Sequence, residues 1–256
     1  KKILSLSPTA TEMLYAIGAG DQVVAVDSLS NYPTEAADKV TKISAFEPNA
    51  EAILGYSPDI VLISNDMNKI TEQLKTAKPD ITVWTGAMAN TIDDVYAQIT
   101  DLGKVTGHDT EAAALIAKMK TDLAAATEGV TAPEGASYYY ELDNTYYSLT
   151  SNTFVGSLLK STGIANIADG VEAGNDWPQL NAESIIKANP SVVFLADTKC
   201  CQQNAAAVAK RAGWADLDAV KNSRVVELDD DIASRWGPRI VDLVKQMVEA
   251  IAALQK

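Results

Sequence analysis

Few residues in this sequence have the types and spacing that catalysis requires. The only histidine, His108, opens the helical sequence HDTEAA, where we expect it to be exposed to solvent or to contribute to a helix cap. No nucleophile elbow, cysteine–histidine pair, HExxH helix motif or phosphate-binding loop occurs in the chain. The aspartates at 229–231 offer paired carboxylates for a cation, but a run of this kind usually forms a solvated loop. We therefore expect that the protein is not an enzyme.

The two cysteines provide neither a metal site nor a disulfide framework. Cys200 and Cys201 are adjacent, and the usual ligand spacings of zinc sites are absent, so we predict no metal centre. A disulfide between neighbouring residues is strained, because their Cα atoms lie closer together than disulfides prefer. We interpret the pair as incidental, with a ring-forming disulfide as the alternative if the chain is exported.

Binding has more support than catalysis, because aromatic side chains gather in predicted loops. Tyr146, Tyr147, Trp177 and Trp236 lie outside the regular elements that the pattern predicts. Flat aromatic faces bury a large area with few hydrogen bonds, and Arg235 adds fixed donors for acidic groups. Core packing explains Trp177 and Trp236 equally well, whereas the polar surroundings of Arg235 favour the rim of a pocket.

The elements that must position these residues alternate between strands and helices. In the first hundred residues this alternation is typical of a parallel, doubly wound α/β sheet. Thr9 and Glu12 have the spacing of a capping box, which predicts a helix start. We predict strands at 3–6, 23–26, 60–63 and 81–84 and a helix within 93–102. Loops after such strands line ligand crevices, and the candidates are residues 28–33, 44–48 and 64–68.

A long helix separates this alternation from a second one. Residues 109–127 are strongly helix-forming, and about 18 residues at 1.5 Å each reach roughly 27 Å. Strands are then predicted at 137–142, 192–195 and 225–228, helices at 154–161 and 205–211, and a last helix starting at Pro238. The predicted organisation is an N-terminal lobe at 1–107, a bridging helix at 108–129 and a C-terminal lobe at 130–256.

One phrase occurs in both predicted lobes. Residues 49–62 read NAEAILGYSPDIVL, and residues 181–194 read NAESIIKANPSVVF. In each copy an asparagine can cap a short helix, a glutamate follows in the first turn, and a proline precedes a buried strand. A duplicated unit explains the phrase, and the helix dipole favours Glu51 and Glu183 by about 0.3–1 kcal/mol. Symmetry alone gives these glutamates no role.

The composition argues against two kinds of partner. The formal net charge is −13, and no cluster of lysine and arginine is present, so we expect no binding to nucleic acid. No apolar run approaches the roughly 18–20 residues of a membrane-spanning helix. The chain opens on KKILSLSP without a signal peptide, which fits a processed export product as well as a cytosolic protein.

Several stretches resemble one family across nearly the whole chain. In order, they are SLSPTATEMLYAIGAGDQVVAVD, the NYP turn, NAEAILGYSPDIVLIS, WPQLNAESIIKANPSVVFLA, RAGWADLDAVKNSRVVELDDD and SRWGPRIVDLVKQM. They look like the class III substrate-binding proteins of ABC importers, which carry cobalamin, haem or ferric siderophores. The resemblance implies two Rossmann-like α/β lobes joined by one long bridging helix, with the ligand in a cleft between the lobes. It also implies an extracytoplasmic protein, periplasmic or lipid-anchored outside the cell, which we expect to be monomeric.

The resemblance implies a role for the repeated glutamates. In this family one glutamate on each lobe meets arginines of the importer's membrane subunits, which work with an ATPase. The positions that match are Glu51 and Glu183. Ion pairs with a permease would explain why an acidic residue recurs at equivalent sites in both lobes.

For the ligand, the pattern most resembles the cobalamin-binding branch. By motif, Trp177 would pack against the corrin ring, and Asp231 and Arg235 would lie near the ligand's polar edge. Two positions depart from that branch. Leu29 stands where the branch has a tyrosine, and Ala45, followed by Phe46, stands where it has a tryptophan.

Other ligands and one other class of protein remain alternatives. Haem needs an axial ligand, for which His108 is badly placed, so Tyr146, Tyr147 and Met67 are the candidates. A ferric siderophore would use the arginine and aromatic residues, and no intrinsic cofactor is expected. An enzyme or metallocluster protein on the same doubled fold lacks the cysteine and histidine ligands it would need. A third alternative is an extracellular sensor. The single bridging helix favours a small movement of the lobes on binding.

Overall fold

The structure, a computed structural model, describes residues 1–255 and divides into two units. Unit 1 comprises Lys1–Met119 and Arg235–Pro238, and unit 2 comprises Lys120–Ser234 and the chain from Arg239 onward. The division falls within helix α6 (Asp109–Thr127), which has the bounds predicted for the long helix. The sequence-based division instead ends its first lobe at residue 107 and leaves 235–238 in the second.

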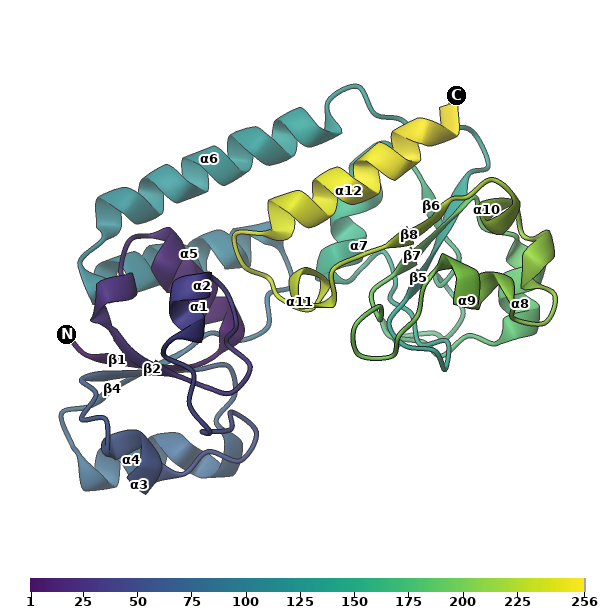
Figure 1. Ribbon diagram of the computed structural model, residues 1–256. Coiled ribbons are helices and arrows are strands. Elements are labelled where there is room, and N and C mark those ends of the chain that lie inside the picture. The colour runs from purple at the N-terminus through teal and green to yellow at the C-terminus, as the bar shows by residue number, and fades with distance from the viewer. Residues whose placement is uncertain (256) are drawn as a thin grey trace. The chain divides into compact units, whose positions relative to one another are not determined.

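Unit 1 is built on a four-stranded parallel sheet. The strands β1 (Ile3–Leu6), β2 (Val23–Val26), β3 (Ile60–Ile63) and β4 (Thr82–Thr85) are ordered β2-β1-β3-β4. Helices α1 (Pro8–Ala16) and α5 (Ile92–Thr106) cover one face, and α3 (Ala50–Leu54) and α4 (Ile70–Ala77) cover the other (Figure 1). Helix α2 (Thr34–Ala37) and 3-10 turns at Gly20–Gln22 and Met67–Lys69 complete the unit. The predicted parallel α/β class is confirmed.

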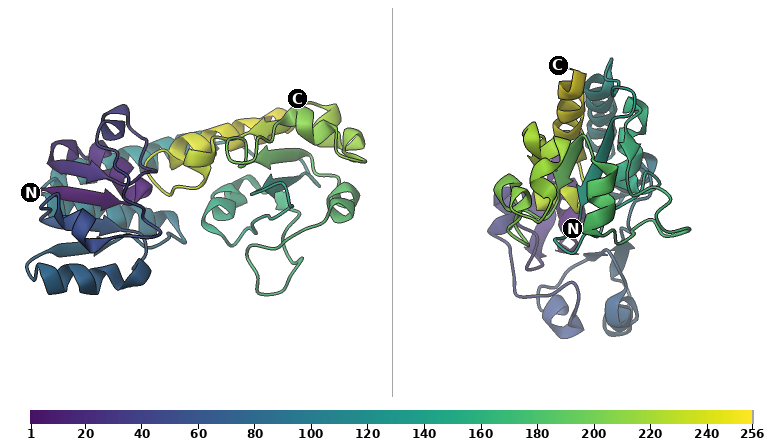
Figure 2. Two further views of the ribbon diagram at one scale, coloured as in Figure 1. Left: turned by 60° about the horizontal axis from the view of Figure 1, so that its bottom comes forward. Right: turned by 90° about the vertical axis from the view of Figure 1, so that its right-hand side faces the viewer.

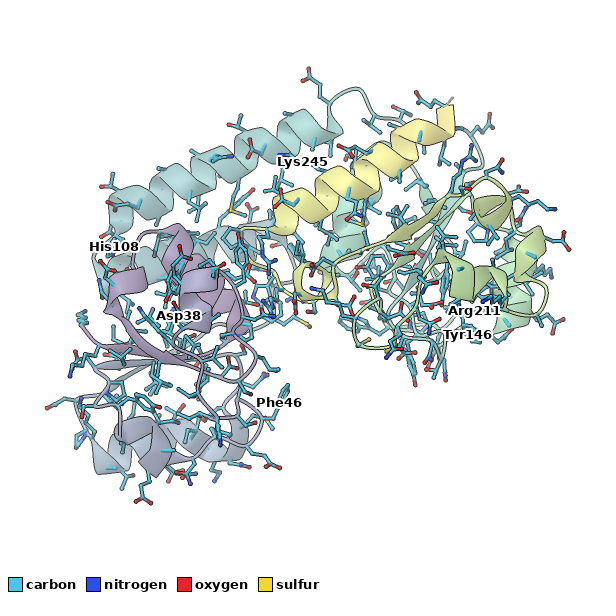
Figure 3. All side chains as sticks on the ribbon, in the orientation of Figure 1. Asp38, Phe46, His108, Tyr146, Arg211 and Lys245 are labelled. Carbon is cyan, nitrogen blue, oxygen red and sulfur yellow. The ribbon has the colours of Figure 1, made fainter. Side chains whose placement is uncertain are left out.

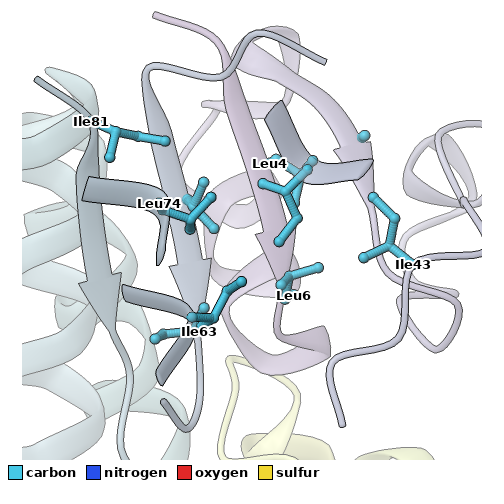
Figure 4. Close-up of a cluster of buried hydrophobic side chains, with 10 residues drawn as sticks. Leu4, Leu6, Ile43, Ile63, Leu74 and Ile81 are labelled. Atoms are coloured by element: carbon cyan, nitrogen blue, oxygen red, sulfur yellow. The ribbon is translucent and has the colours of Figure 1, made fainter. Parts of the chain in front are cut away.

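The alternation of side chains along β1 fills two core layers. Leu4 and Leu6 pack with Ile63 and Leu74 in a buried cluster on the α3–α4 face of the sheet (Figure 4). Ile3 is also fully buried, and by alternation it points to the opposite face. A parallel strand that is covered on both faces is largely apolar, and β1 departs from this only at the buried Ser5, so its bounds can be predicted from the sequence.

Helix α1 starts earlier than predicted. Ser7 is its N-cap and accepts a hydrogen bond from the amide of Ala10 at 3.2 Å, and Pro8 takes the first helical position. The predicted capping box at Thr9 and Glu12 is therefore wrong. Ser7 and Pro8 together supply the cap and a pre-set first residue, so the side chains of Thr9 and Glu12 lie buried within the helix instead.

Unit 2 repeats the same sheet topology. The strands β5 (Ser137–Glu141), β6 (Ala165–Asn166), β7 (Val192–Leu195) and β8 (Val225–Glu227) are parallel in the order β6-β5-β7-β8. Helices α7 (Phe154–Leu159) and α12 (Ile240–Ala252) lie on one face, and α8 (Ala182–Ala188), α9 (Ala205–Ala209) and α10 (Asp218–Lys221) lie on the other (Figure 2). Helix α11 (Asp230–Ala233) and 3-10 turns at Lys160–Thr162, Trp214–Asp216 and Ala253–Gln255 complete the unit.

Aromatic side chains form much of the core of unit 2. Tyr139 belongs to the buried cluster under α8 and α9 and contacts Trp214 edge-on, with ring centroids 6.1 Å apart. Tyr138 and Tyr140 alternate to the other face, where both pack against Phe194. Three consecutive tyrosines therefore serve both core layers of one strand.

Helix α12 starts later than predicted. It begins at Ile240, because residues 238–239 form a turn, so the prediction of Pro238 at the first helical position is wrong. The physical reason is that Arg235–Pro238 pack in unit 1, and the chain turns after them before the helix starts. The predicted apolar face of the helix is buried, including Val244, Met247 and Ile251.

Candidate functional site

A pocket of about 190 Å³ lies at the carboxyl edge of the first sheet. It adjoins the ends of β1 and β3, where the strand order reverses and where ligands bind in sheets of this kind. Leu29, Phe46 and Met67 line it, although they are 49, 66 and 39% exposed. Phe46 projects from the surface of unit 1 (Figure 3). The structure thus brings together three candidate residues that are distant in the sequence.

One carboxylate at this pocket was not predicted from the sequence. Asp27 lines the pocket and is fully buried, and neither of its oxygens has a hydrogen-bond partner of ordinary geometry. Burial raises the pKa of Asp27 above 3.8, although Ser30 and the amide of Leu29 lie near enough to oppose this effect. An acid that directly follows a buried strand, as in VVAVD, is the signal that would have identified it.

Arg235 connects the loop of Leu29 to helix α1. Its guanidinium donates to Oε1 of Glu12 and Oδ1 of Asn31, both at 2.9 Å, and to the carbonyl of Leu29 at 3.2 Å. Arg235 is buried, as is Glu12, so the structure places it beneath the loop and not at an open rim. The half-buried Trp236 donates its Nε1 to Gln98 at 3.2 Å.

In unit 2, Tyr147 and Trp177 lie on two paired segments. Segments 146–150 and 176–180 run antiparallel, with three backbone hydrogen bonds of 3.0 Å and a bridge between Tyr147 and Gln179. Tyr147 and Trp177 are 41 and 44% exposed. Tyr146 alternates to the other face, where its ring stacks on Trp214 with centroids 5.8 Å apart. The structure therefore separates the two adjacent tyrosines.

A buried acidic pair, which was not predicted from the sequence, occupies the carboxyl ends of β5 and β7. Arg211 donates from Nη1 and Nη2 to both oxygens of Glu141 at 2.6 Å, and Glu141 is fully buried. Asp197 is also fully buried, and neither of its carboxyl oxygens receives a hydrogen bond, although the side chain lies close enough to Glu141 to interact with it. Burial and then the charge of Glu141 raise the pKa of Asp197 to about 7. In the sequence, the glutamate that ends the buried strand SYYYE is the feature that could have indicated this ion pair, because a buried charge requires a partner.

The aspartates at 229–231, which were expected to form a solvated loop, make contacts within the protein. Lys199 Nζ donates to Asp229 at 2.8 Å and to Asp231 at 2.9 Å. Asp230 accepts from the amides of Lys199 and Cys200. Within residues 1–255, no group of three or more metal-ligating side chains is arranged to hold an ion. Cys200 and Cys201 are both free thiols.

The two repeated glutamates occupy equivalent positions in the two units. Asn49 caps α3 and Asn181 caps α8, each accepting a hydrogen bond from a backbone amide of the first turn. Glu51 and Glu183 are the second residues of these helices, and both are exposed. The predicted capping of both short helices is confirmed.

Two further observations concern the histidine and the character of the helices. His108 is half-buried, and its Nδ1 lies 3.2 Å from Oγ1 of Thr106, so the ring is placed next to the start of α6. None of the helices within residues 1–255 combines the length and the apolar character that crossing a membrane needs.

Known proteins are similar to this chain over nearly its whole length. The sequence model of the periplasmic binding protein family matches residues 3–232. The uncharacterized ABC transporter substrate-binding lipoprotein YvrC of Bacillus subtilis is 34% identical over 258 residues, covering 98% of this chain and 80% of that protein. The cobalamin-binding protein of Halobacterium salinarum is 30% identical over 258 residues, covering 98% of this chain and 69% of its own.

A solved structure agrees with these sequence relatives. The periplasmic vitamin B12-binding protein BtuF of Vibrio cholerae has a TM-score of 0.76 and 26% identity, and the match covers 100% of this chain and 98% of that one. The relatives are named as binding proteins, and the resemblance predicted from the sequence is confirmed. The chain belongs to the periplasmic binding protein family.

Proposed function

We propose that this protein is an extracytoplasmic substrate-binding protein that captures a metal chelate, a corrinoid of the cobalamin type, and delivers it to an ABC importer. The observation that carries the proposal is the match along 98% of the chain to a cobalamin-binding protein at 30% identity. The relative named as a lipoprotein of an ABC transporter supports the importer and the location outside the cytoplasm.

The exposed apolar side chains support a large, planar ligand. Leu29, Phe46 and Met67 offer an apolar surface on unit 1, and Tyr147 and Trp177 offer aromatic faces on unit 2. Aromatic faces pack well on a flat ring system, because they bury area without requiring hydrogen bonds. The remaining proposed ligand-binding residues are Tyr146, Asp231, Arg235 and Trp236. Arg235 and Tyr146 would act through the loops they hold, since the first is buried and the second faces inward.

We expect a corrinoid to raise the thermal stability of the purified protein. A ligand present at 100 times its dissociation constant adds roughly 2.7 kcal/mol to the free energy of unfolding. The measurement is a thermal scan with cyanocobalamin, hemin or a ferric siderophore, together with the variant Trp177→Ala. The proposal predicts a shift with cyanocobalamin that shrinks in the variant. A shift only with hemin would identify a haem carrier instead, and no shift with any of the three would contradict the proposal.

The exposed glutamates supply a proposed docking surface for the importer. We expect Glu51→Ala combined with Glu183→Ala to lower ligand uptake by more than tenfold, because each truncation removes a charge-assisted pair of about 1.5–3 kcal/mol. Ligand affinity should stay unchanged. Uptake is measured with the importer encoded in the same genome, in proteoliposomes.

The matched control is Glu72→Ala combined with Glu249→Ala, which removes one exposed glutamate from a helix of each unit. It makes the same change in net charge and should leave uptake intact. Loss of ligand affinity in the Glu51/Glu183 variant would assign these residues to the ligand site. An equal loss of uptake in the control would show that the effect comes from the change in net charge and not from docking.

A further inference from the structure

The paired segments 146–150 and 176–180 have two faces with different environments. The amides of Ser148 and Leu180 donate to the carbonyls of Pro178 and Tyr146, so the segments are in antiparallel register. Side chains alternate between the faces of such a pair. Tyr147 and Trp177 share the exposed face, whereas Tyr146 and Leu180 face the buried cluster of unit 2. A contact that holds Tyr146 in place therefore also fixes the orientation of Tyr147 and Trp177.

The inward face is anchored through a continuous stack. The ring of Tyr146 lies over Trp214, which is fully buried, at an interplanar angle of 23°. The guanidinium of Arg211 lies 4.6 Å from the Trp214 ring and 5.7 Å from the Tyr146 ring. Figure 3 shows Tyr146 and Arg211 close together in unit 2. Arg211 is itself fixed by its two bonds to Glu141 on β5, so the stack connects Tyr146 to the central sheet.

Tyr146 maintains an unfavourable backbone conformation. Its φ is +71°, in the left-handed region that residues with a Cβ rarely adopt. Such a conformation costs of order 1–2 kcal/mol for a residue other than glycine, and it persists only where the surroundings hold it. Here the surroundings are the stack on Trp214 and the hydrogen bond from the Tyr146 amide to the carbonyl of Asp143 at 3.1 Å. The turn that ends at Tyr146 leads directly into the paired segment, where Tyr147 takes the opposite face.

We propose that Tyr146 is a positioning residue, which anchors the paired segments on Trp214 and Arg211 and so orients Tyr147 and Trp177 as a platform for the flat face of an apolar ring ligand. The identity of the ligand rests on the proposed function, whereas the anchoring can be tested without any ligand. The proposal gives the two adjacent tyrosines different tasks. Tyr147 contacts the ligand, and Tyr146 holds the turn that presents it.

The test compares Tyr146→Phe, which keeps the stacked ring, with Tyr146→Gly, which removes the ring and relieves the backbone. Val208→Ala serves as a control, because Val208 is fully buried in the same cluster and its truncation destabilises unit 2 without removing the stack. Two measurements need no ligand: amide hydrogen exchange at Leu180 and Ser148, and quenching of Trp177 emission by acrylamide, identified by difference with Trp177→Phe. A third is the affinity for cyanocobalamin, measured under conditions where each variant is fully folded.

We expect Tyr146→Gly to speed exchange at Leu180 about tenfold or more and to increase quenching of Trp177, with Tyr146→Phe and Val208→Ala near wild type. Cyanocobalamin affinity should fall about tenfold in Tyr146→Gly and be restored in Tyr146→Phe. Unchanged exchange and quenching in Tyr146→Gly would overturn the proposal, as would equal changes in Val208→Ala, which would indicate a loss of stability alone. If wild type does not bind cyanocobalamin, the proposed ligand fails, and the two measurements without ligand still decide whether Tyr146 is the anchor.

Discussion

Replacing Arg211 by methionine is expected to lower the free energy of unfolding of unit 2 by about 3–5 kcal/mol. The reason is that Glu141 is fully buried and receives two charge-assisted hydrogen bonds from Arg211 at 2.6 Å. Removing the cation leaves a buried carboxylate without its partner, next to the carboxyl group of Asp197. The variant also loses the guanidinium that lies over Trp214. Urea unfolding followed by circular dichroism and tryptophan fluorescence measures the loss.

Two companion variants separate the contribution of charge from that of geometry. Arg211→Lys keeps the positive charge but not the planar pair of donors, and we expect an intermediate loss. The double variant Arg211→Met with Glu141→Leu removes both charges and should recover most of the stability, because a buried ion pair and an apolar pair of similar volume differ little. A loss below about 1 kcal/mol in Arg211→Met would show that Glu141 does not depend on Arg211.

The strands and long helices of this protein could largely be predicted from the sequence. The bounds of β1, β3, β7 and α6 match the predicted ranges. β3 and β7 are continuous apolar runs buried on both faces, β1 is a buried strand interrupted only by Ser5, and α6 is a long stretch of strong helix formers. Local signals fail where tertiary packing decides, as at Pro238, which suits a helix start but lies in a turn that packs with unit 1.

The candidate site could be predicted only in part, because it depends on contacts between distant residues. The loops of Leu29, Phe46 and Met67 follow parallel strands, so a shared edge could be expected. The pairs Glu141–Arg211 and Glu12–Arg235 join residues that are 70 and 223 positions apart. A single sequence indicates that a buried acid needs a partner, but it does not indicate which arginine provides it.

The second large effect concerns Asp197, whose replacement by asparagine is expected to stabilise unit 2 at neutral and alkaline pH. Asp197 is fully buried, and its pKa rises from 3.8 to about 7, first because of burial and then because of the charge of Glu141. Arg211 opposes this rise and Asp230 adds to it, and the Tyr139 and Cys200 side chains are also close enough to interact with Asp197. Two ionised carboxylates can only accept hydrogen bonds, so a protonated Asp197 is the form that can donate to Glu141.

The sign of the pH dependence follows from the direction of this shift. Between pH 4 and pH 7, folded protein keeps a proton on Asp197 that the unfolded chain has already released. The free energy of unfolding therefore falls as the pH rises through this window, and the full penalty is present above the folded pKa. In Asp197→Asn the amide is neutral at every pH and can still donate to Glu141. The stabilisation relative to wild type should grow from near zero at pH 4 to about 2–4 kcal/mol at pH 8.

The measurement is the free energy of unfolding at several pH values for wild type, Asp197→Asn and the control Asp216→Asn. Asp216 is in the same unit, but its side chain is 88% exposed, so the same chemical change should leave the pH dependence as in wild type. If Asp197→Asn and wild type show the same slope, Asp197 is ionised in the folded protein, and Arg211 compensates both carboxylates. If instead the slopes diverge, the folded protein keeps a proton on Asp197 that the unfolded chain has released. The charge at the carboxyl edge of the second sheet then depends on pH within the physiological range.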